Sequence, residues 1–158
     1  MSWPRRLTLP ALLAVLAFGG CEESNSGSND PDKNRDFRQD MMDFVVALSD
    51  WARQTVPGFI VIPQNGHDIY SSNFDATDPI DTAYFDAIGG LGREDLRYGY
   101  MGDNLATDPA VTAEVELFLD VFEANGKEVL VTDYIKFSSG INASFTANKT
   151  KGYIIFQA

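Results

Sequence analysis

The chain has 158 residues, 44% of them hydrophobic, and a formal net charge of -11. This length predicts a single domain. The acidic charge argues against partners that are themselves anionic, such as nucleic acid or an anionic membrane surface. A cationic substrate, for example an amino-sugar polymer, would be attracted.

Residues 1–20 have the pattern of a lipoprotein signal peptide. Arg5 and Arg6 precede an apolar run from Leu7 to Phe18, which is too short to cross a bilayer as a permanent helix. Cys21, the only cysteine, follows two glycines, as in a lipobox. We therefore predict an exported bacterial cell-envelope lipoprotein, on the outer membrane or cell surface, that contacts the lipid bilayer through acylated Cys21. The alternative is an ordinary signal peptide that ends near a cysteine.

Residues 21–35 are predicted to be a flexible linker. From Glu22 to Arg35 the segment has no apolar residue apart from its glycine and proline, so it has nothing to bury. The remaining residues, 36–158, form the predicted domain.

Three helices are predicted in this domain. The first covers about residues 36–55, where apolar side chains recur at three- and four-residue steps, and Trp51 is expected in the core because it lies on that stripe. Asp78-Pro79 and Asp108-Pro109 are each typical of a helix start. Asn125-Gly126 is expected to end the third helix.

Four strands are predicted near residues 59–63, 87–91, 128–133 and 152–156. Their short apolar runs are typical of strands covered on both faces, and they alternate with helices, which favours an α/β fold with a parallel sheet. Strand order should follow the sequence, with all C-terminal ends on one side. The segment from Ile141 to Lys149 is ambiguous.

Polar side chains follow three of these strands: Gln64-Asn65, Glu94-Asp95 and Asp133-Tyr134. In parallel α/β folds the C-terminal ends of the strands form the edge where ligands bind. We therefore expect a site at this edge, with the amides of Gln64 and Asn65 suited to sugar hydroxyls.

Glu94 is a candidate catalytic carboxylate at this edge, and two outcomes are open for it. If Arg93 and Arg97 both reach Glu94, it is a structural ion-pair partner. If tyrosines such as Tyr98, Tyr100 and Tyr134 screen Glu94 from water instead, its pKa rises and it can donate a proton.

The second catalytic carboxylate is less well defined. Asp95 is a poor partner for Glu94, because neighbours on an extended segment point to opposite sides. Asp133 is the better candidate within this chain, since successive strand ends meet at one rim. His67 is the only histidine, so no histidine cluster for a metal exists, and we predict neither a metal nor a cofactor.

Four motifs resemble the endo-α-1,4-polygalactosaminidase family, glycoside hydrolase family 114. They are Val61-Ile62-Pro63-Gln64-Asn65-Gly66, Leu91-Gly92-Arg93-Glu94-Asp95-Leu96-Arg97-Tyr98-Gly99-Tyr100, Val129-Leu130-Val131-Thr132-Asp133-Tyr134 and Lys151-Gly152-Tyr153-Ile154-Ile155-Phe156. The resemblance implies a (β/α)8 TIM barrel that cleaves galactosamine-containing polysaccharide with two carboxylates. It makes Glu94 catalytic, and it puts Gln64, Asn65, Tyr98, Asp133 and Tyr134 on the rim of the sugar site. From the sequence pattern we add Tyr100 to this site, where Tyr98 or Tyr100 could cover a sugar face.

Two departures from the family stand out. His67 occupies a position where many relatives have an acid, and such barrels need about 250 residues. The matching motifs correspond to the second half of the barrel, strands five to eight. In the family, the partner carboxylate is an aspartate at the end of strand four, in the first half.

We therefore predict an exported glycoside hydrolase-like protein, whose sequence is a truncated barrel, a misassembled one, or a half-barrel that dimerises. It would hydrolyse O-glycosidic bonds of a galactosamine-containing polysaccharide. The alternative is a non-catalytic lipoprotein that binds polysaccharide through the same rim. A half-barrel also leaves two open strand edges, which predicts self-association or a failure to fold alone.

Overall fold

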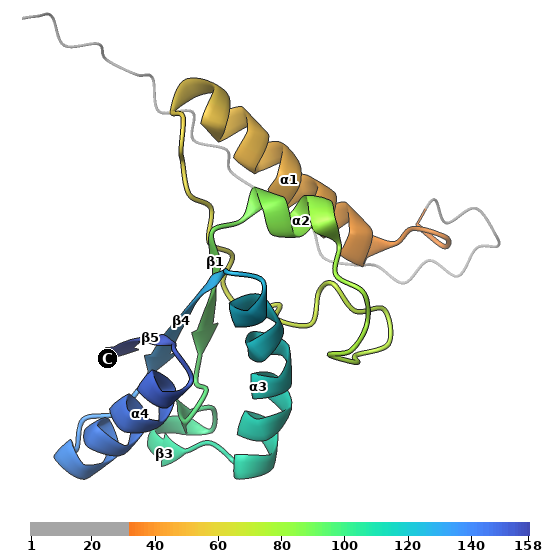
Figure 1. Ribbon diagram of the computed structural model, residues 1–158. Helices are drawn as coiled ribbons and strands as arrows, with labels where there is room; N and C mark the ends of the chain where they lie inside the picture. The colour runs from red at the N-terminus through yellow and green to blue at the C-terminus, as the bar shows by residue number, and fades with distance from the viewer. Residues whose placement is uncertain (1–31) are drawn as a thin grey trace, which may run out of the picture. The chain divides into compact units, whose positions relative to one another are not determined.

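The computed structural model describes residues 32–158, and its helices and strands lie in the compact unit Arg35–Ala158 (Figure 1). The predicted signal peptide and Cys21 lie outside the described residues. The helices are α1 (Phe37–Thr55), α2 (Thr82–Ala87), α3 (Pro109–Ala124) and α4 (Ser138–Thr150). The strands are β1 (Gly90–Glu94), β2 (Tyr98–Gly99), β3 (Gly102–Ala106), β4 (Glu128–Asp133) and β5 (Ile154–Gln157). The protein is a mixed α/β protein.

The main sheet is parallel and has the order β1-β4-β5. A fourth extended segment, Pro63 to Asn65, lies parallel to β1 and is hydrogen-bonded to it. The Gly92 N–H donates to the Pro63 carbonyl at 2.8 Å, and the Asn65 N–H donates to the Gly92 carbonyl at 2.7 Å. The four segments therefore run parallel and in sequence order, as the alternation of elements predicted. The strand expected at 59–63 is reduced to an isolated bridge between Gln64 and Gly92, and β1 begins three residues later than expected.

The two faces of this sheet differ. On one face Leu91, Val129 and Val131 are buried against the apolar side of α3, and α4 packs against β5. We call this the packed face. Side chains alternate between the two faces along a strand. The register pairs Gly92 with Leu130 and Leu130 with Ile154, so these residues and those two positions away from them in each strand lie on the other face. We call it the open face; its residues are Ile62, Gln64, Gly92, Glu94, Leu130, Thr132, Ile154 and Phe156.

The helix ends follow their capping residues. Asp36 caps α1 by accepting from the Gln39 N–H at 3.0 Å, and Asp108 caps α3, as expected. Asn125 and Gly126 end α3, with Gly126 in the left-handed region. The start predicted at Asp78 is wrong: α2 begins after Asp81, because the Asp78 carboxylate accepts from the Ser71 hydroxyl in the preceding loop.

The side of helix α1 that is buried is not the side with the large apolar residues, which was expected to be buried. Its buried residues are Met42, Val45, Ser49 and Ala52, and the Ser49 hydroxyl donates to the Ala87 carbonyl at the end of α2. Trp51 is 67% exposed, so its predicted place in the core is wrong. The physical reason is that the hydrogen bond of Ser49 fixes the side of α1 that contains Ser49 and Ala52 against α2, so the large apolar side chains on the other side face outward. The exposed stripe is Phe37, Met41, Phe44, Leu48 and Trp51.

The β2–β3 hairpin was not expected from the sequence, and the segment that forms α4 was ambiguous. The hairpin lies beside the C-terminal end of β4: the Tyr134 N–H donates to the Tyr98 carbonyl and the Asn104 N–H to the Tyr134 carbonyl. Within residues 32–158, no helix combines the length and the apolar character needed to span a membrane.

Candidate functional site

Three predicted site residues meet at the C-terminal end of the parallel segments. Glu94 is the last residue of β1, and the Tyr134 hydroxyl, just past β4, donates to Glu94 Oε1 at 2.8 Å. The Glu94 N–H donates to Asn65 Oδ1 at 3.3 Å. The register with Thr132 places Glu94 on the open face. The strand ends thus bring Asn65, Glu94 and Tyr134 into one cluster, and the hydrogen bond to Glu94 raises the pKa of the Tyr134 hydroxyl.

Among residues 32–158, no ion pair joins Glu94 to either neighbouring arginine. Arg97 pairs with Glu116 and donates to Asn148 Oδ1 at 2.8 Å, both on the packed face. Arg93 Nε is buried with no hydrogen-bond partner, and this burial lowers the pKa of Arg93. Neither arrangement left open by the sequence is found in full: the arginines do not pair with Glu94, but they lie on the packed side and do not point outward. Of the three tyrosines expected to screen Glu94, Tyr134 contacts it, by donating a hydrogen bond.

Asp95 is not on an extended segment, as the sequence analysis assumed. Its φ of 59° is left-handed, and two hydrogen bonds hold its backbone, from the Asp95 N–H to the Thr132 carbonyl and from the Thr107 hydroxyl to the Asp95 carbonyl. Asp95 Oδ1 is buried without a hydrogen-bond partner. Burial, followed by the charge of Glu94, raises the pKa of the Asp95 carboxyl.

Gly99 makes room for this carboxylate. A Cβ on Gly99 would lie 2.3 Å from Asp95 Oδ1 and 2.9 Å from the Tyr134 ring, and the φ of Gly99 is +123°. Asp95 and Tyr134 therefore both lie against Gly99, and any side chain there would displace them.

Asp133 does not face Glu94. It is fully buried on the packed face and accepts four hydrogen bonds. The donors are the Arg97 N–H at 2.8 Å, the Tyr98 N–H at 3.2 Å, the Ser144 hydroxyl at 2.6 Å and the Asn148 amide at 3.2 Å. This is the environment of a structural carboxylate. The two carboxylates predicted to act together are therefore not brought together.

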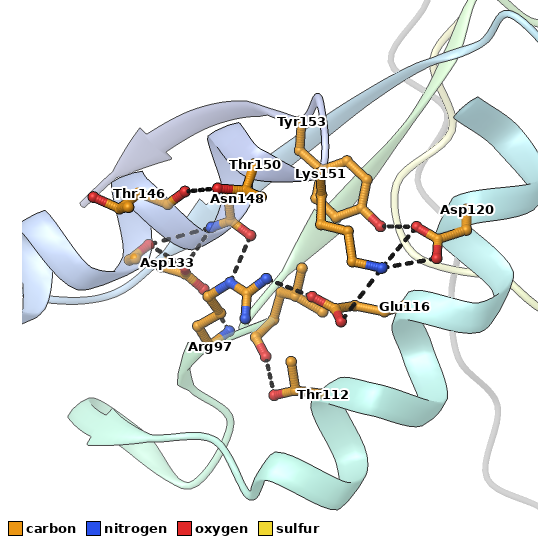
Figure 2. Close-up of polar contacts among 12 residues, drawn as sticks. Arg97, Thr112, Glu116, Asp120, Asp133, Thr146, Asn148, Thr150, Lys151 and Tyr153 are labelled. Atoms are coloured by element: carbon orange, nitrogen blue, oxygen red, sulfur yellow. Dashed lines mark hydrogen bonds and ion pairs between the residues drawn. The ribbon is translucent and has the colours of Figure 1, made fainter. Parts of the chain in front are cut away.

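Asp133 belongs to a polar network behind the site (Figure 2). From Asn148 the network passes through Arg97 to Glu116 on α3, and from there through Lys151 to Asp120. Figure 2 also shows Tyr153, whose hydroxyl donates to Asp120 Oδ1 at 2.9 Å. The network joins the segment after Glu94 to α3 and α4, so it holds the site from the packed side. Sequence reasoning missed Ser144 and Asn148; their four-residue spacing within 141–149 was the available signal.

The other predicted sugar-binding residues are more dispersed. Gln64 is exposed on the open face beside Gly92. Tyr98 packs edge-on against Phe137 at 6.0 Å between ring centroids, and it lines a pocket of about 370 Å³ between α3, α4 and the hairpin. Tyr100 is 55% exposed at the turn of the hairpin. Of these three, Gln64 shares a face with Glu94.

His67 packs against α3. Its ring lies edge-on to Phe118 at 5.5 Å, and burial, followed by the charge of Arg93, lowers its pKa. In the part of the chain that the structure describes, no three or more His, Cys, Asp or Glu side chains are grouped so that they could hold a metal ion.

Comparison of the chain with protein-family models finds no match, and comparison with curated proteins finds none either. The fold and the cluster define an α/β protein with a carboxylate site at the C-terminal edge of a parallel sheet.

Proposed function

We propose that residues 36–158 are half of a (β/α)8 barrel of the glycoside hydrolase type, with Glu94 as the proton donor. Four parallel segments in sequence order, with helices on one face, support the architecture. The observation that carries the proposal is the position of Glu94, on the open face and at the C-terminal end of the strands, where the Tyr134 hydroxyl holds one of its carboxyl oxygens.

In this mechanism a carboxylic acid protonates the leaving glycosidic oxygen while a second carboxylate acts as nucleophile or base. Glu94 is the acid. Tyr134 fixes one carboxyl oxygen, and the Asn65 side chain accepts from the Glu94 backbone, so the carboxyl group is oriented before substrate binds. The amide of Gln64 binds sugar hydroxyls, and exposed Tyr100 covers a sugar face. The acidic chain favours a galactosamine polymer, which carries positive charge.

The proposal also includes export. Cys21 is the acylated first residue of the mature lipoprotein, and residues 21–35 tether the domain to the bilayer. The mass of the mature N-terminal peptide tests this part: a diacylglycerol-modified Cys21 supports it. An unmodified Cys21, or cleavage elsewhere, contradicts it.

The catalytic part is tested with Glu94→Gln and the full chain, by following new reducing ends on an α-1,4-linked galactosamine polymer. A general acid contributes about 10²–10⁴-fold, so the rate should fall at least about a hundredfold. Glu114→Gln, on an exposed glutamate of α3, is the matched control and should retain the rate. If Glu94→Gln retains the rate as well, or loses it only by unfolding, Glu94 is not the acid.

The second candidate function is polysaccharide binding without cleavage. It is favoured by the position of Asp133, which leaves Glu94 without the partner predicted within this chain. Retarded migration of the wild-type chain in a gel that contains the polymer, with no new reducing ends, would select this candidate.

A further inference from the structure

The sheet has two unpaired edges within the described residues. β5 ends the order on one side, and the segment from Pro63 to Asn65 ends it on the other. Both edges belong to parallel strands that run in the same direction, so the edge of one copy can pair with the opposite edge of another. An uncovered apolar edge is a template for such pairing.

Large apolar side chains are exposed at both edges. Ile62 is 41% exposed on one edge, and Ile154 and Phe156 are 52% and 64% exposed on the other. The exposed stripe of α1 precedes the first edge in the chain, and Phe59 and Ile60 connect the two. At the far end, α4 precedes β5 and exposes Phe145. Many of the exposed apolar side chains of the described residues therefore lie on the elements at the two ends of the sheet, although Phe74, Met101 and Leu117 are exposed elsewhere.

We propose that the occupant of these edges is a second copy of this chain, and that two copies close one eight-stranded parallel barrel. In this dimer β5 of each copy pairs with the Pro63–Asn65 segment of the other, and the exposed stripe of α1 covers the partner's α4 and β5. Eight strands are the number at which side chains fill a closed barrel. The proposal rests on the half-barrel architecture of the proposed function and is independent of the role of Glu94.

The exposed area suffices for a stable dimer. Ten large apolar residues contribute: the five of the α1 stripe together with Phe59, Ile60, Ile62, Ile154 and Phe156. Aromatic side chains bury about 150–250 Å² each, so the five aromatic residues of the set, at roughly half exposure, offer on the order of 500 Å² per copy. The five aliphatic residues, which are exposed to a similar degree, bring the total to roughly 800–1,000 Å². A stable interface needs about 800 Å² per partner.

Closure also changes the site. A two-fold axis along the barrel places both Glu94 side chains on one rim and inside one lumen. The open face of each copy becomes the barrel interior, where water is restricted. The second copy brings another carboxylate to the rim, which two-carboxylate hydrolysis requires.

The test is disulfide trapping in the full chain with Cys21→Ser, which removes the only native thiol. Ile62→Cys is combined with Ile154→Cys, and in a second chain with Phe156→Cys, to sample two registers. Within one copy these positions lie on opposite edges, too far apart to bridge. The expected result after mild oxidation is a dimer band on a non-reducing gel for at least one double variant.

The controls separate closure from other association. Each single variant should stay monomeric on the gel, because the contact joins unlike edges. Leu117→Cys with Ile154→Cys, which moves one thiol to an exposed site on α3, should also stay monomeric. A monomer in both double variants, equal trapping in the control, or a ladder of trimers and higher species would each overturn the proposal. Adding Glu94→Gln should leave trapping unchanged, so a failure of the dimer is distinguishable from a failure of the catalytic assignment.

Discussion

The two faces of the parallel sheet show how one chain divides stability from function. On the packed face, Asp133 is fully buried and accepts four hydrogen bonds. On the open face, Glu94 has a tyrosine and an asparagine as neighbours, and the apolar residues Ile62, Ile154 and Phe156 are exposed. A carboxylate with all its acceptor positions used holds the fold, whereas one with a free oxygen at a strand end is available for chemistry. The predictions below test this division.

The largest effect on stability is expected for Asp133→Asn. The amide nitrogen would face groups that donate to the carboxylate, which leaves buried donors unsatisfied, and the free energy of unfolding should fall by about 3 kcal/mol. Urea denaturation measures this loss. Glu94→Gln is the comparison from the open face and should change stability by less than about 1 kcal/mol. If both variants lose the same free energy of unfolding, the two faces do not differ in their contribution to stability.

Substitutions on the buried side of α1 should lower the free energy of unfolding more than substitutions on its exposed side. Met42→Ala removes a fully buried side chain and should cost about 2 kcal/mol or more, as buried methionines do. Phe44→Ala removes a side chain that is 60% exposed, so at low protein concentration the midpoint of denaturation should hardly move. A loss at Phe44 that grows with protein concentration would instead report the proposed dimer.

Gly99→Ala tests the packing beside the site. The substitution puts a Cβ 2.3 Å from Asp95 Oδ1 at a φ of +123°, so we expect a loss of about 1–2 kcal/mol and a displaced Asp95. Gly126→Ala is the control for backbone strain alone, since its φ is +69° and nothing lies within 4 Å of the added atom. The site account requires that sugar affinity fall for Gly99→Ala and not for Gly126→Ala.

One further effect is expected only at alkaline pH. Burial raises the pKa of Tyr84 to about 12 in the folded chain, above its ordinary value of 10.0. The protonated hydroxyl is therefore favoured by folding: its contribution is complete below pH 10 and is lost as the pH rises toward 12. Tyr84→Phe should flatten the decline in stability across this window. An unchanged decline would show that other groups cause it.

Much of the fold follows from local signals. The caps at Asp36 and Asp108 and the stop at Asn125-Gly126 define α1 and α3, and the apolar run at 128–133 defines β4, because each signal acts within a few residues. The face that α1 presents could not be predicted in this way. Its apolar residues cover more than one side of the helix, and the choice is made by Ser49, which bonds a residue 38 positions away.

The site was predictable in part for a similar reason. That three strand ends meet follows from a parallel sheet, so Asn65, Glu94 and Tyr134 could be proposed together. Asp133 lies on the opposite face from Glu94 because the strand register pairs Glu94 with Thr132, the neighbour of Asp133. Contacts between residues distant in the sequence set this register, so it could not be predicted. The left-handed backbone of Asp95 was also invisible, since a non-glycine residue rarely adopts it.

The measurement that tests the central claim most directly is an NMR titration of the ¹⁵N-labelled chain with a galactosamine oligomer. The account predicts that the amide shifts concentrate at the open-face rim, at Asn65, Glu94 and Tyr134. Amides of the packed face, such as those of Ser144 and Asn148, should stay unchanged. Shifts confined to the pocket between α3 and α4, or no shifts at any accessible oligomer concentration, would contradict the claim that the open face is the functional one.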